Sequence, residues 1–439
     1  MDKPWDSGIL RVMDNKQYFA NGTKPFFMLG DTAWTLFQKL TKDESYTYLK
    51  NRKEKGFTTI AAVFVNFQSR SPKSYFGDVA EYDITEFLKP SHDEYWKHIE
   101  SVVAMAEELG LYMALLPVWG NVVKDGKLNE QNAEAYTNFL IEKFARFPNI
   151  CWVLGGDIRG DANFGVWDKM GALFKAKDSA RLVSYHPFGR TCSSYWFQDC
   201  EWLDFHMFQS GHRRSDQRQL NAWDEAVFAE PWFGEESYRY VQENLNKLPK
   251  RPILDGEPSY EMIPQGLHNP SEPYWQAHHV RRYAYWSVLS GAAGHIYGHN
   301  AIIQFFGTGS DPVYGALETW DLSIHDVGSS HMQIMKNLLE EIDFANSKPM
   351  QNVVFAKSDF NAAFGNKRHV LIYSYSGKPF SVNAVAGETE GEFEGYWIDP
   401  CSGVRSYLGN VKLDGKPVEF SPPNKKTDFN DWLLHLARI

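Results

Sequence analysis

The first 348 residues repeat one pattern eight times: a short apolar run ends at polar residues, and a longer segment follows it. The clearest run, 58–65, is rich in β-branched residues and carries no charge, which is typical of a strand buried on both faces of a parallel sheet. Eight such units predict a (β/α)8 barrel rather than a doubly wound sheet. The runs lie at 26–29, 58–65 with polar residues 66–68 after it, 111–118, 149–157, 181–185, 202–208, 252–254 and 294–297.

Helical segments connect these runs. The first is predicted to begin after Thr41, because a threonine N-cap with Glu44 at the third helical position forms a capping box, and to end near Lys55 before Gly56. Further helices are expected at 92–109, 129–147, 273–290 and 329–341. The apolar stretch 283–306 is therefore interpreted as a buried helix running into a strand, not as a membrane span.

The two ends of the chain have a different pattern. Residues 10–27 alternate apolar and polar side chains around two turns, which predicts a β-hairpin beneath the barrel. After about Lys348 the chain changes to short alternating segments separated by turns, which predicts a small antiparallel β-sandwich. The predicted domains are 1–348 and 349–439.

Three of the eight runs end at or near a carboxylate, namely Asp31, Asp157 and Glu257, and the last two are the candidates for catalysis. Asp157 follows the run that begins at Asn149, and Glu257 follows the run 252–254, one hundred residues later. A strand–helix unit takes roughly 30 to 40 residues, so the two acids lie about three units apart on one ring. Each acid alone could instead pair with an arginine or cap a helix. Together, at the carboxyl ends of barrel strands, they predict the catalytic pair of a retaining glycosidase.

Composition excludes several other classes of function. The net charge is −10 and no run of Lys or Arg is present, so a nucleic-acid partner is not expected. The sequence lacks HExxH, GxxxxGK[ST] and GxSxG, which argues against metalloproteases, phosphate-loop enzymes and serine hydrolases. Aromatic residues make up 15% of the chain, a level that suits a site where sugar rings stack.

Neither a metal nor a cofactor is predicted. The four cysteines form no CxxC pair; Cys192 and Cys200 could form a disulfide, although free thiols are the preferred interpretation. Histidines 186, 212, 295 and 299 follow or lie near predicted strand ends, but none has a compact ligand spacing with an acid. Binding of sugar hydroxyls explains them without a metal.

Several polar and aromatic residues near the strand ends are candidates for binding substrate. Arginine binds a carboxylate through two hydrogen bonds, so Arg159 is a candidate for an acidic sugar, whereas Arg213 and Arg214 are more simply solvated loop charges. The aromatic candidates could equally pack the barrel rim, and Asp31 could equally be structural. The full set is Asp31, Trp34, Trp119, Arg159, His186, His212, Tyr260, Tyr297 and Asn300.

Four motifs carry a family resemblance: GDTAW at 30–34, LGGD at 154–157, DGEPSYE at 255–261 and YGHN at 297–300. Together they resemble the apiosidase-like glycoside hydrolases of family 140, often first labelled family 5, with a C-terminal collagen-binding-type domain. The resemblance implies that Asp157 is the acid/base and Glu257 the nucleophile. It also implies cleavage of apiosyl linkages to galacturonan in the pectin rhamnogalacturonan II by gut Bacteroidetes.

Such an enzyme is expected in the periplasm, on the cell surface or secreted, after removal of a signal peptide that this chain does not show. The wider clan has Asn-Glu where this chain has Gly156-Asp157, so the shorter side chain must reach further or sit on a displaced backbone, with Asp161 as the alternative acid. Two other functions stay open: a family 5-like glycosidase of another specificity, and a non-catalytic surface protein that binds glycans.

Overall fold

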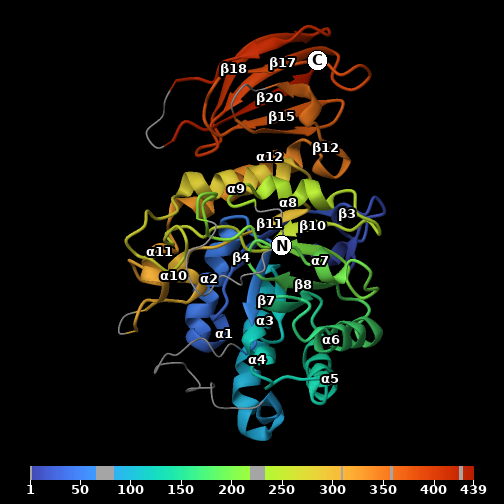
Figure 1. The fold of residues 1–439 in the computed structure, drawn as a ribbon, viewed down its shortest axis with the longest axis vertical. Coiled ribbons are helices and arrows are strands. Elements are labelled where there is room, and N and C mark those ends of the chain that lie inside the picture. Colours follow the sequence, from blue (N-terminus) through green and yellow to red (C-terminus); the bar gives the residue numbers. More distant parts are fainter. Residues whose placement is uncertain (1, 66–83, 218–232, 308–309, 356–358, 425–428) are drawn as a thin grey trace.

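The structure, a computed structural model, describes residues 2–65, 84–217, 233–307, 310–355, 359–424 and 429–439. It has two parts, a large barrel and a smaller sandwich that lies above it in Figure 1. The polar residues 66–68, predicted to follow the second barrel strand, lie outside the described residues. In the described part of the chain, every helix is too short or too polar to span a lipid bilayer.

Eight parallel strands form the barrel in the order β8-β7-β6-β5-β4-β11-β10-β9. The backbone N–H of Asp204, just before β9, donates to the carbonyl of Val183 in β8 over 2.9 Å, which brings the two ends of the sheet together. The predicted (β/α)8 fold is therefore confirmed. The strands are β4 (Met28–Thr32), β5 (Thr59–Val63), β6 (Tyr112–Leu116), β7 (Ile150–Ile158), β8 (Val183–Pro187), β9 (His206–Phe208), β10 (Ile253–Asp255) and β11 (Gly294–Tyr297).

Helices surround the barrel, and their ends follow local sequence signals. The hydroxyl of Thr41 accepts from the N–H of Glu44, whose carboxylate accepts from the N–H of Thr41, as the predicted capping box requires. Gly110 ends α3 in a left-handed conformation, with φ of 70°. The longer helices are α2 (Lys42–Glu54), α3 (Asp93–Leu109), α5 (Ala133–Phe144), α6 (Phe164–Lys177), α8 (Ser237–Asn244), α9 (Ala277–Leu289) and α12 (Val327–Glu341); the shorter are α1 (Leu36–Lys39), α4 (Gly120–Lys124), α7 (Ser194–Phe197), α10 (Asn300–Ile303) and α11 (Trp320–Ser323).

The N-terminal segment forms a three-stranded sheet of β1 (Leu10–Val12), β2 (Phe19–Asn21) and β3 (Lys24–Phe26), which contains the predicted hairpin. Asn21 donates to the hydroxyl of Tyr112, the first residue of β6, and the ring of Phe26 packs on the ring of Tyr112. These contacts place the small sheet at the amino-terminal end of the barrel, opposite the end where the acids lie.

The C-terminal part is an antiparallel sandwich, as predicted. A six-stranded sheet has the order β12-β14-β15-β20-β17-β18, and a three-stranded sheet has the order β13-β16-β19. Buried apolar side chains such as Ile372, Phe393 and Trp397 form its core. The strands are β12 (Lys348–Pro349), β13 (Val354–Phe355), β14 (Asn361–Gly365), β15 (His369–Ser374), β16 (Phe380–Val382), β17 (Gly391–Ile398), β18 (Arg405–Leu413), β19 (Val418–Phe420) and β20 (Trp432–Arg438).

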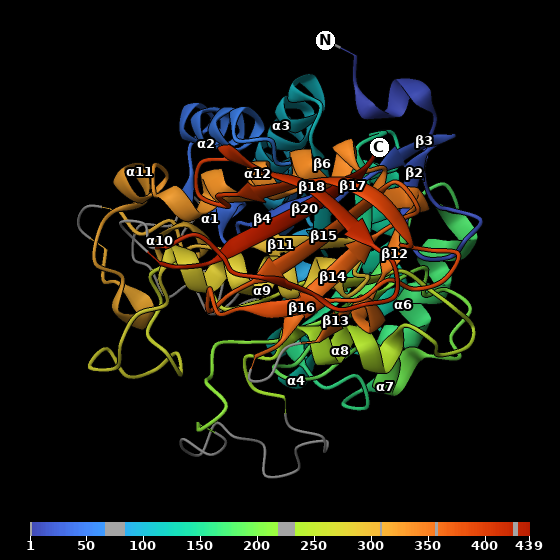
Figure 2. The ribbon, with the colours of Figure 1, turned by 90° about the horizontal axis from the view of Figure 1, so that it is seen from above.

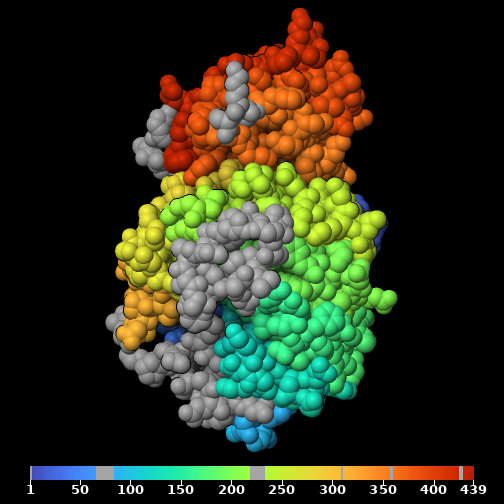
Figure 3. All heavy atoms as spheres, in the orientation of Figure 1, coloured from blue at the N-terminus to red at the C-terminus, as the bar shows by residue number. Residues whose placement is uncertain are grey.

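The sandwich packs on helices α9 and α12 of the barrel (Figures 1 and 2). In the space-filling view the sandwich sits directly on the yellow helical layer (Figure 3). Arg281 of α9 donates to both oxygens of Asp431, over 3.0 and 2.9 Å, and all these side chains are buried. Tyr373 of β15 also donates to Asp431, over 2.8 Å, and its ring stacks on Tyr285 of α9. The two parts therefore share a continuous apolar and ionic interface.

The four cysteines are free thiols. Cys192 and Cys200 therefore form no disulfide, in agreement with the preferred interpretation of their spacing.

Candidate active site

The two predicted catalytic acids meet at the mouth of the barrel. Asp157 belongs to β7, and Glu257 lies two residues after the end of β10. One carboxylate oxygen of each acid and one ring nitrogen of His186 all lie within 4.8 Å of one another. Retaining glycosidases place their carboxyl groups about 5–5.5 Å apart, whereas inverting enzymes need about 6.5–9.5 Å to admit a water. The close approach therefore fits direct attack by one acid.

A bulge in β7 brings the carboxyl group of Asp157 into the site, although an aspartate side chain is shorter than the glutamate of the wider clan. Residues 155, 156 and 157 all have positive φ, at 90°, 105° and 50°, and the pairing of β7 with β8 shifts between Gly155 and Ile158. A Cβ on Gly155 would lie 2.2 Å from the carbonyl oxygen of His186, and one on Gly156 would lie 2.8 Å from the ring of Trp119. Only glycines fit there, so the Gly-Gly-Asp sequence displaces the backbone and brings a short acid into the site.

Two histidines hold Glu257 as a carboxylate. His212 Nε2 lies 2.9 Å from Glu257 Oε1, and His186 Nε2 lies 3.1 Å from Oε2. Glu257 is buried, which by itself would raise its pKa, but the contacts with His186 and His212 lower that pKa to about 2. The side chain is therefore charged throughout the neutral range, as a nucleophile must be.

The pKa of Asp157 is shifted in the opposite direction to that of Glu257. The Asp157 side chain is exposed at the mouth, but partial desolvation by the surrounding protein, together with the negative charge of Glu257, raises the pKa of Asp157 to about 7. His186, a hydrogen bond from Gln209 and the charge of Arg190 oppose the rise only in part. Near neutral pH one acid is ionised and the other holds a proton for much of the time, which is the division that acid-assisted displacement needs.

Aromatic side chains surround the acid pair. Trp34 Nε1 donates to the hydroxyl of Tyr260 over 3.1 Å, and the ring of Trp34 lies 5.0 Å from that of Trp119 and 5.3 Å from that of His186. The ring of Tyr260 lies 4.7 Å from that of His212. Three of the four predicted aromatic residues, Trp34, Trp119 and Tyr260, therefore converge on the site, but each is buried, so they shape its wall more than they offer a broad open face.

Asp255 ties the strand of Glu257 to its neighbours. Its buried Oδ2 accepts from the hydroxyl of Ser210, after β9, over 2.9 Å and from that of Ser287 in α9 over 3.2 Å. Burial raises the pKa of Asp255 to about 8, although the hydrogen bonds from Ser210 and Ser287 partly lower it. A protonated Asp255 thus connects two strands and a helix directly below the nucleophile.

Asp31 and Tyr297, which we expected to bind substrate, face the helical layer instead. Arg52 of α2 donates to Asp31 over 2.5 Å, and the hydroxyl of Tyr48 donates to the same oxygen. Tyr297 donates to Glu261, which also accepts the N–H of Gly328 at the start of α12 over 3.2 Å. Side chains alternate between the two faces of a strand, and these two lie on the outer face. We correct both to structural residues.

Asn300 acts on the site through another residue. Its amide donates to the carbonyls of Met262 and Tyr314, over 3.0 and 2.9 Å. Burial and the negative charges of Asp157 and Glu257 raise the pKa of Tyr314 to about 12. Tyr314, Gln209 and Arg190 were not among the residues predicted from the sequence. Only Gln209 could have been predicted from the sequence, since it directly follows the apolar run 202–208.

Asp161, the alternative acid, is engaged elsewhere. Arg159 donates to both of its oxygens, over 3.0 and 2.8 Å, and this contact lowers the pKa of Asp161. An ionised, exposed carboxylate bound to arginine is a poor proton donor. The same pairing occupies Arg159, which was predicted to bind an acidic sugar. The geometry therefore favours Asp157 over Asp161.

The absence of a metal stays a prediction. Asp157, His186 and Glu257 place their ligand atoms close enough for an ion, but the first acid holds a proton for much of the time near neutral pH and the third is bound by His212. His299 contacts Asp326 over 2.8 Å, away from this group.

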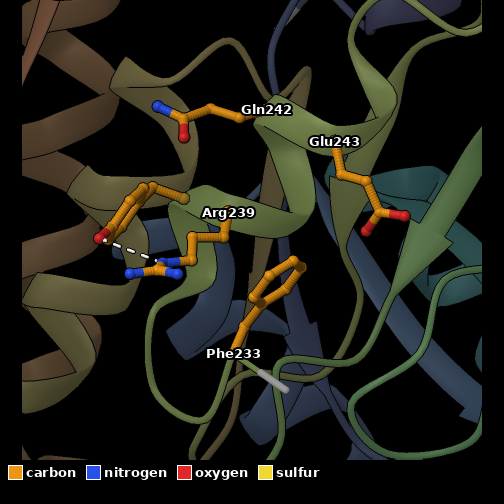
Figure 4. A pocket seen from close by; sticks show the side chains of 5 residues that line it. Phe233, Arg239, Gln242 and Glu243 are labelled. Atoms are coloured by element: carbon orange, nitrogen blue, oxygen red, sulfur yellow. Dashed lines mark hydrogen bonds between the residues drawn. The ribbon is translucent and has the colours of Figure 1, made fainter. Parts of the chain in front are cut away.

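A surface hollow of about 510 Å³ lies beside α8, apart from the two acids (Figure 4). It is lined by Phe233, Tyr238, Arg239, Gln242 and Glu243 and lacks a pair of acids.

Comparison with known families agrees with this geometry. Residues 13–346 match the family model described as "Apiosidase-like, catalytic domain". The chain belongs to the apiosidase-like family. Residues 349–437 match the model described as "Putative collagen-binding domain of a collagenase".

Two solved structures resemble this apiosidase-like protein along its whole length. A glycoside hydrolase is 34% identical, with a TM-score of 0.91, over 100% of this chain and 98% of the other. A glycoside hydrolase family 5 protein from Bacteroides vulgatus ATCC 8482 is 35% identical, with a TM-score of 0.91, over 100% of this chain and 95% of the other. A comparison with curated proteins finds no match. The protein is a glycosidase with a family 5-like barrel.

Proposed function

We propose that this glycosidase cleaves apiosyl linkages to the galacturonan backbone of rhamnogalacturonan II with retention of anomeric configuration. The observation that carries the mechanism is the close pair of acids with opposed pKa shifts, at about 2 for Glu257 and about 7 for Asp157. The specificity is supported by the apiosidase-like family match and by the motifs at 30–34, 154–157, 255–261 and 297–300.

In the first step the Glu257 carboxylate attacks the anomeric carbon while Asp157 gives its proton to the departing glycosidic oxygen. The carbon–oxygen bond to the leaving group breaks, and a glycosyl ester on Glu257 forms. In the second step Asp157, now ionised, takes a proton from water. That water attacks the anomeric carbon and releases Glu257 as a carboxylate.

The surrounding residues adjust these steps. His186 and His212 keep Glu257 ionised before attack, and the same contacts stabilise it as a leaving group in the second step. Loss of the proton from Asp157 in the first step is assisted by the Gln209 hydrogen bond and the Arg190 charge, which favour the ionised form.

We further propose that the enzyme works in the periplasm, at the cell surface or after secretion, since a polymeric pectic glycan must be met outside the cytoplasm. A non-catalytic glycan-binding role fits less well, because binding alone does not require two acids held in opposite protonation states.

Product analysis on a panel of pectic oligosaccharides tests the proposal. Wild-type protein is expected to release apiose-linked products from rhamnogalacturonan II fragments, whereas Glu257→Gln, which keeps the shape but removes the attacking charge, loses activity by roughly 10⁴-fold or more. Substrate binding, measured by calorimetry, should be largely retained. Glu94→Gln, a change at an exposed position in α3, is the matched control and keeps full activity. Release of a different sugar would reject the apiosyl specificity, and equal activity of Glu257→Gln would reject the mechanism.

A further inference from the structure

Arg282 of α9 lies in an aromatic surrounding where the barrel meets the sandwich. Its guanidinium carbon is 5.1 Å from the ring centre of Trp286 and 4.8 Å from that of Tyr375, which belongs to the sandwich. Trp275 and Tyr283 lie at 5.9 and 5.4 Å. The side chain of Arg282 is only 8% exposed. Cation–π contacts offset part of the cost of burying this charge, but they satisfy none of its N–H groups.

The hydrogen bonding of this guanidinium is incomplete. Among the described residues, no acceptor lies within reach of its buried Nε and Nη2 atoms. Glu235 approaches a different atom, Nη1, at 3.9 Å, which is too long for a hydrogen bond. Nε and Nη2 form the edge of a guanidinium that binds the two oxygens of a carboxylate side by side. Trp286 Nε1 is a further buried donor without an acceptor in the described part of the chain.

Buried donors without acceptors destabilise the folded protein, most of all when they are charged, so a cluster of them indicates a ligand that supplies acceptors. The position of the cluster relates it to the active site. Trp275, next to Arg282, donates to the carbonyl of His212 over 3.0 Å, and His212 contacts Glu257. Arg282 therefore lies behind the wall of the catalytic site, on the side of the sandwich.

A surface hollow lies on the far side of Tyr238 from Trp286 and Arg282. The ring of Tyr238 lies 5.4 Å from that of Trp286 and is partly exposed, as is Tyr375. Tyr238 also lines the hollow of about 510 Å³ beside α8 (Figure 4), and Arg239 donates to its hydroxyl over 3.5 Å. The rings of Tyr238 and Trp286 thus connect the hollow to the position of Arg282.

We infer that Arg282 anchors a second carbohydrate site, which binds the carboxylate of a uronic acid residue through Nε and Nη2 with Trp286 and Tyr375 against the sugar. The inference rests on the proposed function only for the choice of galacturonate as the uronic acid. Both domains contribute to the site, so it gives the sandwich a role in holding an acidic polysaccharide beside the catalytic barrel.

Calorimetric titration with sodium D-galacturonate tests this site. The Glu257→Gln protein is the reference, so that no turnover occurs, and Arg282→Lys and Arg282→Gln are made in it. Lysine keeps the positive charge and the cation–π contacts but loses the paired donors. Galacturonate binding should weaken at least tenfold in both variants, whereas Arg146→Gln, an exposed change in the 145–149 segment, leaves it unchanged. D-galactose and acetate should bind at least tenfold more weakly than galacturonate.

Equal galacturonate affinity before and after Arg282→Lys would overturn the inference, and so would galactose or acetate binding as tightly as galacturonate. If Arg282→Gln does not fold, Arg282→Lys alone decides. Binding is measured without hydrolysis, so failure of the second site is distinguishable from failure of the proposed apiosidase activity, which is measured as product release by wild-type protein.

Discussion

At the scale of single residues, the roles of the two acids can be separated by the leaving group. Asp157→Asn removes the proton donor, so cleavage of the natural linkage should fall by about 10²- to 10⁴-fold, while the first step on an activated aryl glycoside is little affected. Azide, which needs no deprotonation, should then restore the second step. Asp161→Asn is the control, since its carboxylate is bound by Arg159. Loss of activity in Asp161→Asn with retention in Asp157→Asn would reverse the assignment.

The pH dependence follows from the same two groups. The active form needs Glu257 ionised and Asp157 protonated, with pKa values of about 2 and about 7. The kcat/KM for the natural linkage should therefore be constant in mildly acidic solution and decline as pH rises through about 7. Asp157→Asn should remove this alkaline decline. A profile that keeps rising above pH 8, or an unchanged decline in Asp157→Asn, contradicts the role of Asp157 as the acid.

The sequence was sufficient to predict that Asp157 and Glu257 lie together at the mouth of the barrel, because apolar runs that end in carboxylates mark strand ends. It was insufficient for Asp31 and Tyr297, which also stand at strand ends, because a one-residue change in where a strand begins moves a side chain from the mouth to the helical layer. Tyr314 could not be found, since it lies in a loop after β11, where Asn300 donates to its carbonyl.

At the scale of elements, Asp255 should make stability depend on pH. Burial raises its pKa from 3.8 to about 8, so the folded protein holds a proton that the unfolded chain has lost between these values. Its stabilising contribution is complete below about pH 4 and is lost as pH rises through about 8, by up to about 1.4 kcal/mol per pH unit. Asp255→Asn keeps the shape and removes the charge.

Thermal unfolding measured from pH 5 to 8 checks this prediction. The wild-type melting temperature should fall with pH more steeply than that of Asp255→Asn. Asp168→Asn, in helix α6 on the outer layer of the barrel, is the control and should keep the wild-type slope. Parallel slopes for wild type and Asp255→Asn would show that Asp255 is ionised in the folded protein.

Element positions were predicted more reliably than element lengths. The eighth strand, 294–297, agrees in full, whereas the sixth is limited to His206–Phe208 instead of 202–208. The Asp204 carboxylate there accepts the N–H of Val183 over 2.9 Å, so this part of the run forms a turn. A side chain that replaces a ladder hydrogen bond leaves no periodic signal in the sequence.

At the scale of the whole molecule, the barrel and the sandwich should unfold together, because Arg281 and Asp431 form a buried ion pair between them. Asp431→Ala leaves the guanidinium without its carboxylate and should cost about 3–5 kcal/mol of unfolding free energy. Arg405→Gln breaks an exposed ion pair with Glu341 across the same interface and should cost less than about 1 kcal/mol. Denaturant unfolding with two separate transitions, or equal effects of the two changes, would contradict this account of the interface.

The presence of two domains could be predicted from the change of pattern near Lys348, but not the way in which they join. Arg281 and Asp431 are 150 residues apart, and nothing in either local sequence distinguishes a buried interdomain pair from two surface charges. The stacking of Tyr285 on Tyr373 is likewise visible only once α9 and β15 are placed side by side.

The central claim, that Glu257 attacks the sugar directly with Asp157 as acid/base, is tested most directly by the stereochemistry of the first product. Proton NMR of the released sugar, recorded before it equilibrates between anomers, gives its configuration. The oxygens of the two acids lie within 4.8 Å of each other, which fits the spacing of retaining enzymes, so the first product should have the same anomeric configuration as the substrate. A first product of inverted configuration would contradict the account.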